Sequence, residues 1–247
     1  MTAPAAARRA DVAPLISAHR GGCETAPEGT YAAYRAALAA GAKYLEFDVR
    51  LTADHQLVAY HDARLPSGQE VTATSYAELC RAAGYEVPTT SELIQLMAGR
   101  AGAHVDLKDP AAGAAVIAQA LGLLSPASIV VTSRDPAAVR TVKERHPEVG
   151  AGLTIGGDAA ESARHAARWA RPARWADAVA AATADWAAVH HRLARASVLA
   201  ECRRRGLHTL VWTVNADASL RRWLARPDVD VLVTDRPGRA AALRPAR

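Results

Sequence analysis

The sequence predicts a single α/β domain of the TIM type, in which eight parallel strands alternate with helices and close into a (β/α)8 barrel. Three observations support this fold. The length of 247 residues suits one barrel better than two small domains. Short apolar runs alternate with helical segments along most of the chain, which indicates a parallel sheet. Polar residues gather where these runs end, and barrels place their active sites at that edge.

Each expected strand is a short apolar run bounded by turn signals. In chain order these runs are 15–17, 44–48, 56–61, 104–107, 129–133, 149–155, 186–190, 208–214 and 229–234. Nine runs are one more than a (β/α)8 barrel needs. The alternation alone also allows a doubly wound sheet, but no G-x-G-x-x-G segment follows a strand.

The expected helices follow from capping residues and from glycines that end them. Thr89 and Glu92 have the spacing of a capping box, and Asp135-Pro136 pairs an N-cap residue with proline at the first helical position. Gly41 and Gly206 close two further helices. The expected ranges are 30–40, 75–83, 92–98, 111–124, 136–145, 197–205 and 217–224, with a loop at 63–74 and a helical region of unclear bounds within 158–185.

Composition narrows the class of protein. Half of the residues are hydrophobic, which argues against global disorder, and the net charge of +5 is only a mild bias toward anionic substrates. No charge block or aromatic–basic stripe indicates nucleic acid, and no apolar run approaches the ~20 residues of a membrane span. Three cysteines without C-x-x-C spacing make reducing cytoplasm the default compartment. We expect a disordered leader at 1–14 and one domain at 15–247.

One stretch near the N-terminus concentrates the candidate chemistry. Glu46 and Asp48 are two residues apart in an apolar run, so both carboxylates point to one face of a strand. His19 and His61 lie at the ends of the flanking runs. Buried carboxylates need a positive partner, which predicts a hard metal ion with two imidazoles beside it for proton transfer.

A second pair repeats this pattern. Asp106 and Lys108 also share one face of a strand, which fits either a structural ion pair or a site for an anionic phosphodiester. In the second case Asp106 binds the metal and Lys108 binds a phosphate oxygen. Arg20 is expected to hold phosphate through its forked donors, and it can pair with Glu28 as well.

The motifs that carry these residues keep one order along the chain: HRG at 19–21, PE-x-T at 27–30, E-x-D at 46–48, HD at 61–62, DLK at 106–108, VWTVN at 211–215 and VTDRP at 233–237. In this order the sequence resembles the glycerophosphodiester phosphodiesterase family over nearly its whole length. The resemblance implies a TIM-type barrel. It also implies metal-assisted hydrolysis of a glycerophosphodiester to glycerol 3-phosphate and an alcohol.

Combined with this resemblance, the residues give a complete expected site. His19 and His61 are the acid and base in an unassigned order, and a divalent ion is bound by Glu46, Asp48 and Asp106. All-oxygen ligation favours Mg2+ or Ca2+. Arg20 and Lys108 bind the substrate, and the resemblance places Trp212 in the substrate pocket.

The sequence departs from the family pattern at a few positions. Gly29 stands where Asn is usual and would loosen that turn, Asp106 replaces Glu, and Ser133-Arg134 replaces Ser-Phe and puts a charge near the pocket. His104 is expected to be either a supporting partner or a buried neutral residue, and Asp235 is expected to be a structural cap.

Two other functions stay open from the sequence. One is a phospholipase D-like reaction on lysophospholipids or sphingolipids. The other is a non-catalytic phosphate-binding barrel. We expect a small-molecule substrate, no nucleic-acid partner and no stable membrane anchor. The head group, the metal and the oligomeric state stay open.

Overall fold

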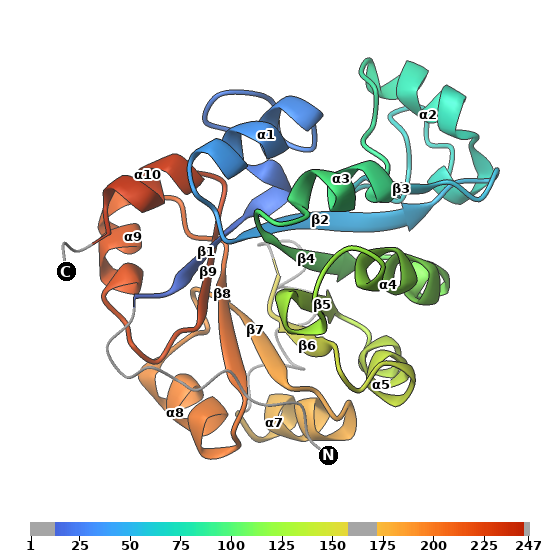
Figure 1. Cartoon of the computed structure of the whole chain (residues 1–247). Coiled ribbons are helices and arrows are strands. Elements are labelled where there is room, and N and C mark those ends of the chain that lie inside the picture. The colour runs from blue at the N-terminus through green and yellow to red at the C-terminus, as the bar shows by residue number, and fades with distance from the viewer. Residues whose placement is uncertain (1–12, 158–171, 245–247) are drawn as a thin grey trace.

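Eight parallel strands close into a barrel in the computed structural model, which describes residues 13–157 and 172–244 (Figure 1). The barrel strands are β1 (Leu15–Ala18), β2 (Tyr44–Leu51), β4 (Gly102–Leu107), β5 (Ile129–Ser133), β6 (Gly150–Ile155), β7 (Trp186–His190), β8 (His208–Trp212) and β9 (Val231–Thr234). They pair in the order β1-β9-β8-β7-β6-β5-β4-β2, and β1 pairs with β2 to complete the ring. The TIM-type barrel is therefore confirmed.

The ninth expected strand lies outside the ring. Strand β3 (Leu57–Ala59) is shorter than the predicted 56–61 and runs antiparallel to β2 as a hairpin arm. It opens an insertion of residues 52–88 that carries its own apolar cluster of Val58, Leu65, Val71, Leu79 and Val87. The insertion projects from one end of the barrel in Figure 1 and contains helix α2.

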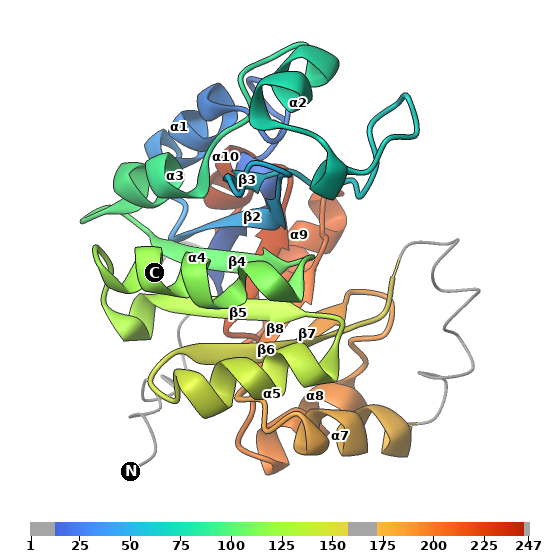
Figure 2. The same cartoon turned by 90° about the vertical axis from the view of Figure 1, so that its right-hand side faces the viewer.

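Helices surround the barrel, and Figure 2 shows α4 lying over β4 and β5 and α5 lying beside β6. Their bounds are α1 (Tyr31–Ala39), α2 (Tyr76–Ala83), α3 (Thr90–Met97), α4 (Gly113–Leu121), α5 (Pro136–Arg145), α7 (Pro172–Ala181), α8 (Ala196–Arg204), α9 (Asp217–Leu224) and α10 (Pro237–Ala242), with 3-10 turns at His19–Gly21, Val71–Ala73, Pro110–Ala112 and Pro126–Ser128. Thr30, Ser75, Thr89 and Asp135 each accept a backbone N–H at a helix start. Helix α10 was not predicted, and α3 begins two residues before its expected start.

The interior of the barrel is filled below the site by a small apolar cluster. Ala188, Leu210, Val231 and Val233 pack there against Tyr44, Trp186 and Trp212. Glycines make the room: a Cβ on Gly150 would lie 2.7 Å from Trp186 Nε1, and one on Gly152 would lie 2.8 Å from Trp186 Cβ. The indole of Trp186 stacks on His208 with 4.7 Å between ring centroids. The bottom of the barrel is therefore closed by side chains, as TIM barrels require.

Part of the sequence-based expectation falls outside the described residues. This holds for residues 1–12 of the expected leader and for residues 158–171 of the expected helical region, of which α7 is described. Pro14, the last residue of the expected leader, is buried, and its carbonyl accepts a hydrogen bond from Arg244. Among the described helices, none combines the length and apolar character that a membrane span needs.

Candidate active site

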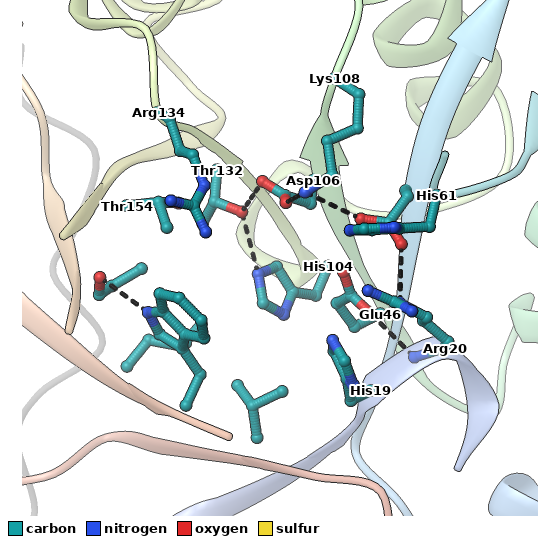
Figure 3. A pocket seen from close by; sticks show the side chains of 15 residues that line it. His19, Arg20, Glu46, His61, His104, Asp106, Lys108, Thr132, Arg134 and Thr154 are labelled. Atoms are coloured by element: carbon teal, nitrogen blue, oxygen red, sulfur yellow. Dashed lines mark hydrogen bonds and ion pairs between the residues drawn. The ribbon is translucent and has the colours of Figure 1, made fainter. Parts of the chain in front are cut away.

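One pocket at the carboxyl ends of the barrel strands brings together all eight residues that the sequence singled out (Figure 3). They are His19, Arg20, Glu46, Asp48, His61, Asp106, Lys108 and Trp212. Their roles stay predictions, because position alone does not assign chemistry. The pocket is also lined by His104, Thr132, Arg134, Thr154, Ala188, Leu210 and Val233.

Three carboxylates form the acidic centre of the pocket. Glu46 and Asp48 alternate along β2 and are both 3% exposed, and Asp106 lies directly opposite Asp48 on β4. One oxygen from each of the three side chains lies within 4.8 Å of the others. The register between neighbouring strands thus places the third carboxylate beside the first two.

Two cations form ion pairs with Asp48 and Asp106, two of these three carboxylates. Lys108 Nζ lies 2.5 Å from Asp106 Oδ2 and 3.1 Å from Asp48 Oδ1, and Arg20 Nε lies 3.0 Å from Asp48 Oδ2. Arg20 also pairs with Glu28 through Nη1 at 2.8 Å, so the ion pair expected from the sequence forms. The two cations therefore lie beside any anion that enters the pocket.

Arg20 is held in an unfavourable backbone conformation. Its φ of 49° lies in the left-handed region, which costs a residue with a side chain about 1–2 kcal/mol. In this conformation the backbone N–H of Arg20 donates to Glu46 Oε2 at 2.8 Å, and its carbonyl accepts from the N–H of Gly29 at 2.8 Å. Gly29 itself has a φ of 72°, so the glycine suits a left-handed turn that is held by backbone hydrogen bonds. The expected loosening of that turn is therefore not what the structure shows.

Burial and mutual charge separate the pKa values of the carboxylates. Burial, followed by the charge of Asp48, raises the pKa of Glu46 to about 8. Burial also acts to raise the pKa of Asp106, but the adjacent Lys108 outweighs it and the net pKa is lowered. The acidic centre is thus short of positive charge near Glu46, where a cation would find an unneutralised ligand.

His19 is oriented by a carboxylate from the opposite end of the chain. Its Nδ1 lies 2.6 Å from Asp235 Oδ1, and the other oxygen of Asp235 accepts a hydrogen bond from Asn215. Burial lowers the pKa of His19, but Glu46 and Asp235 outweigh it and the net pKa is raised. The interpretation of Asp235 as a structural cap was wrong, because its side chain holds the imidazole of His19 through Nδ1.

His61 lies at the mouth of the pocket and is 44% exposed. Its Nδ1 lies 2.8 Å from Asp62 Oδ1. Arg50 donates to the carbonyl of His61 from Nε at 2.9 Å and from Nη2 at 2.7 Å. No sequence pattern indicated this role for Arg50, which fixes the backbone that presents His61.

His104 is buried beneath the carboxylates and connects two strands. Its Nδ1 lies 3.2 Å from Ser17 Oγ, and its Nε2 lies 3.2 Å from Thr132 Oγ1. The Thr132 hydroxyl donates to Asp106 Oδ1 at 3.0 Å, so its oxygen is left to accept from the imidazole. Burial lowers the pKa of His104 to about 4. His104 is therefore a buried neutral residue and also a partner that supports Asp106. Both of the expected alternatives hold.

This buried imidazole predicts an acid-dependent loss of stability. Since the pKa of His104 falls from 6.5 to about 4 on folding, the unfolded chain binds the extra proton between these values. Stability from this residue is then complete above pH 6.5 and is lost toward pH 4, by ~3 kcal/mol. Urea unfolding at pH 7 and pH 4.5 should show a smaller loss in His104→Gln than in the wild type. Equal losses would contradict the assignment.

The wall opposite the carboxylates combines Trp212, which the resemblance placed in the pocket, with residues to which the sequence analysis gave no role. Trp212 donates from Nε1 to the carbonyl of Ala188 at 3.0 Å, and His190 meets its ring edge-on at 5.0 Å. Arg134 and Thr154 complete the wall. Threonines in strands give no sequence signal, so Thr132 and Thr154 could be found only from the closed barrel.

The residues present fit a hard divalent ion. Asp48 Oδ2 is buried without a hydrogen bond, although Arg20 lies near it, and the three carboxylates offer only oxygen donors. A second group, His19, Glu28 and Asp235, also has metal-ligand spacing. It fits less well, because Asp235 already holds His19 and Glu28 is paired with Arg20.

The closed barrel, with paired imidazoles, carboxylates and cations at the carboxyl ends of its strands, defines a TIM-barrel enzyme for an anionic substrate. The profile of the Glycerophosphoryl diester phosphodiesterase family matches residues 19–239. The chain therefore belongs to this family of phosphodiesterases, as its motifs indicated.

Individual relatives agree with the family match. The chain is 25% identical over 240 residues to YhdW of Bacillus subtilis, whose name refers to glycerophosphodiester phosphodiesterase, covering 90% of this chain and 94% of that one. A glycerophosphodiester phosphodiesterase structure from Agrobacterium tumefaciens is 26% identical with a TM-score of 0.72, covering 92% and 99%. An Oleispira antarctica phosphodiesterase, solved with sn-glycerol-3-phosphate, is 21% identical with a TM-score of 0.75, covering 94% and 96%.

Proposed function

We propose that this enzyme hydrolyses glycerophosphodiesters to glycerol 3-phosphate and an alcohol, with a divalent ion and two histidines. The observation that carries the proposal is the meeting of His19 and His61 with the three-carboxylate centre in one pocket. Family membership supplies the substrate class. The proposed product is the compound with which the Oleispira protein was solved.

The carboxylates of Glu46, Asp48 and Asp106 would hold the ion. Bound there, Mg2+ or Ca2+ supplies charge stabilisation to a phosphoryl oxygen. Lys108 and Arg20 flank the same carboxylates, so their donors lie close enough to share the negative charge that builds on the other phosphoryl oxygens.

The two histidines divide the proton transfers. One imidazole removes the proton from the attacking hydroxyl or water, and the other protonates the departing alkoxide. Asp235 fixes the ring of His19 with Nδ1 engaged, so His19 exchanges its proton through Nε2. Arg50 holds the backbone of His61 at the pocket mouth.

The direct test is turnover of sn-glycero-3-phosphoglycerol with a divalent ion present. We expect release of glycerol 3-phosphate and glycerol, loss of the rate after chelation, and recovery on addition of Mg2+ or Ca2+. Phosphorus NMR distinguishes this outcome from a cyclic phosphate product. A rate that survives exhaustive chelation would remove the metal from the proposal, and absence of turnover with every metal would remove the substrate class.

A further inference from the structure

The pocket has two chemically different halves. Strands β1, β2 and β4 and the segment after β3 supply the histidines, carboxylates and cations of the proposed reaction, whereas Ala188, Leu210, Trp212 and Val233 line the other half. A phosphodiester that places phosphorus at the carboxylate centre must extend an esterified group away from it. The less polar half is the space that the pocket offers to that group.

Arg134 stands between these halves. It follows β5 and has the strand parity of Thr132, whose side chain contacts His104 and Asp106 inside the barrel. Figure 3 shows its guanidinium reaching into the pocket near Thr154. Arg134 thus brings a permanent positive charge to the wall that otherwise carries small, hydroxyl and aromatic side chains.

Two of the contacts that Arg134 makes help to hold its guanidinium in place. Arg134 Nη1 donates to the carbonyl of Gly156 at 2.9 Å, and its guanidinium carbon lies 5.6 Å from the centroid of the Trp212 ring. Trp212 is itself held by its hydrogen bond to Ala188 and by the edge of His190. The guanidinium therefore engages the aromatic face that could otherwise attract a ligand ammonium.

We propose that Arg134 makes this enzyme selective for the charge of the esterified alcohol. Alcohols that carry a carboxylate or a further phosphate are favoured, and alcohols that carry a quaternary ammonium are disfavoured. This inference rests on the proposed function and adds the substrate class to it. Two unit charges at pocket distances, partly screened by water, correspond to about a tenfold preference, which falls as ionic strength rises.

The experiment compares three diesters that share the glycerophosphate part. The probes are glycerophosphoglycerol, the same compound with a terminal phosphate, and glycerophosphocholine. Initial rates at low substrate give kcat/KM at low and high salt for wild type, Arg134→Lys, Arg134→Gln and Arg140→Gln. Arg140 is exposed on α5, the helix that follows Arg134, so its variant controls for the change in net charge.

In the wild type we expect the phosphorylated diester to exceed the neutral one by about tenfold at low salt, with choline lowest. Arg134→Gln should remove most of this spread, so that the three diesters give similar values of kcat/KM. Arg134→Lys should keep part of the spread, and Arg140→Gln should keep all of it. Added salt should reduce the differences in kcat/KM among the three diesters in the wild type. This measurement does not depend on whether any variant folds.

Two results would overturn the proposal. A wild-type spread that is absent or insensitive to salt would show that no pocket charge selects the alcohol. An equal loss on all three probes in Arg134→Gln would place the guanidinium on the phosphate that they share. Failure of the wild type on the neutral probe would instead count against the proposed function itself.

Discussion

Replacing His19 by alanine should lower kcat/KM for an unactivated glycerophosphodiester by ~10²-fold or more, the usual scale for one lost proton-transfer group. His19 is the imidazole whose Nδ1 is held by Asp235, so its loss removes an oriented group rather than a mobile one. His61→Ala should have a loss of similar size. The two histidines together predict a bell-shaped dependence of kcat/KM on pH.

The leaving group distinguishes the acid from the base. A p-nitrophenyl ester departs without protonation, so the variant lacking the acid should recover most of its rate on that substrate. The variant lacking the base should stay slow on both substrates. If both variants kept near wild-type rates on the unactivated diester, the acid–base assignment would be wrong.

Asp235→Asn supplies a matched test of orientation and charge. The amide keeps the size of the side chain but removes a charge that raises the pKa of His19. The limb of the pH profile that belongs to His19 should then move to lower pH, whether His19 is the acid or the base. A merely structural Asp235 would change the rate without moving that limb.

Removing the charge of Asp106 should weaken metal binding and activity together. Asp106→Ala reduces three carboxylates to two around a divalent ion, and it leaves Lys108 with Asp48 as its remaining partner among these three. Calorimetric titration with Mg2+ and Ca2+ is expected to show a loss of affinity of ~10-fold or more, the scale seen when a metal site loses a supporting group. Glu144→Ala, an exposed carboxylate on α5, is the control.

The substitution Asp106→Glu tests whether the pocket accommodates a carboxylate side chain that is one methylene longer. Asp106 is held by Thr132 at 3.0 Å and by Lys108 at 2.5 Å, so a glutamate must shift these partners to reach the same place. Activity in Asp106→Glu would show that the spacing tolerates the family's usual length. Unchanged affinity and activity in Asp106→Ala would remove Asp106 from the metal site.

Much of this arrangement follows from local sequence patterns. Period-two spacing placed Glu46 and Asp48 on one face, and the capping signal Asp135-Pro136 located the start of α5. The same patterns produced one strand too many, because a short apolar run predicts a strand without revealing its partner. Strand β3 is such a run, and only the observed pairing shows that it is antiparallel to β2.

Contacts between residues that are far apart in the sequence could not be predicted from local sequence patterns. Asp235 and His19 are 216 residues apart and meet because β9 pairs with β1 when the barrel closes. Thr132 reaches Asp106 through the register between β5 and β4. Arg134 was noticed only as a departure from a family pattern, and its place beside Trp212 depended on three-dimensional packing.

The hairpin arm β3 gives the two histidines separate supports. His19 follows a strand of the ring, whereas His61 is carried by the 52–88 insertion, which has an apolar cluster distinct from the main core. Arg50, on β2, joins the two parts through the carbonyl of His61. Because Leu57 and Ala59 of β3 pack in the main core, an exchange of the insertion between barrels would have to preserve them together with Arg50. Such an exchange would alter the support of His61 and leave the three carboxylates in place.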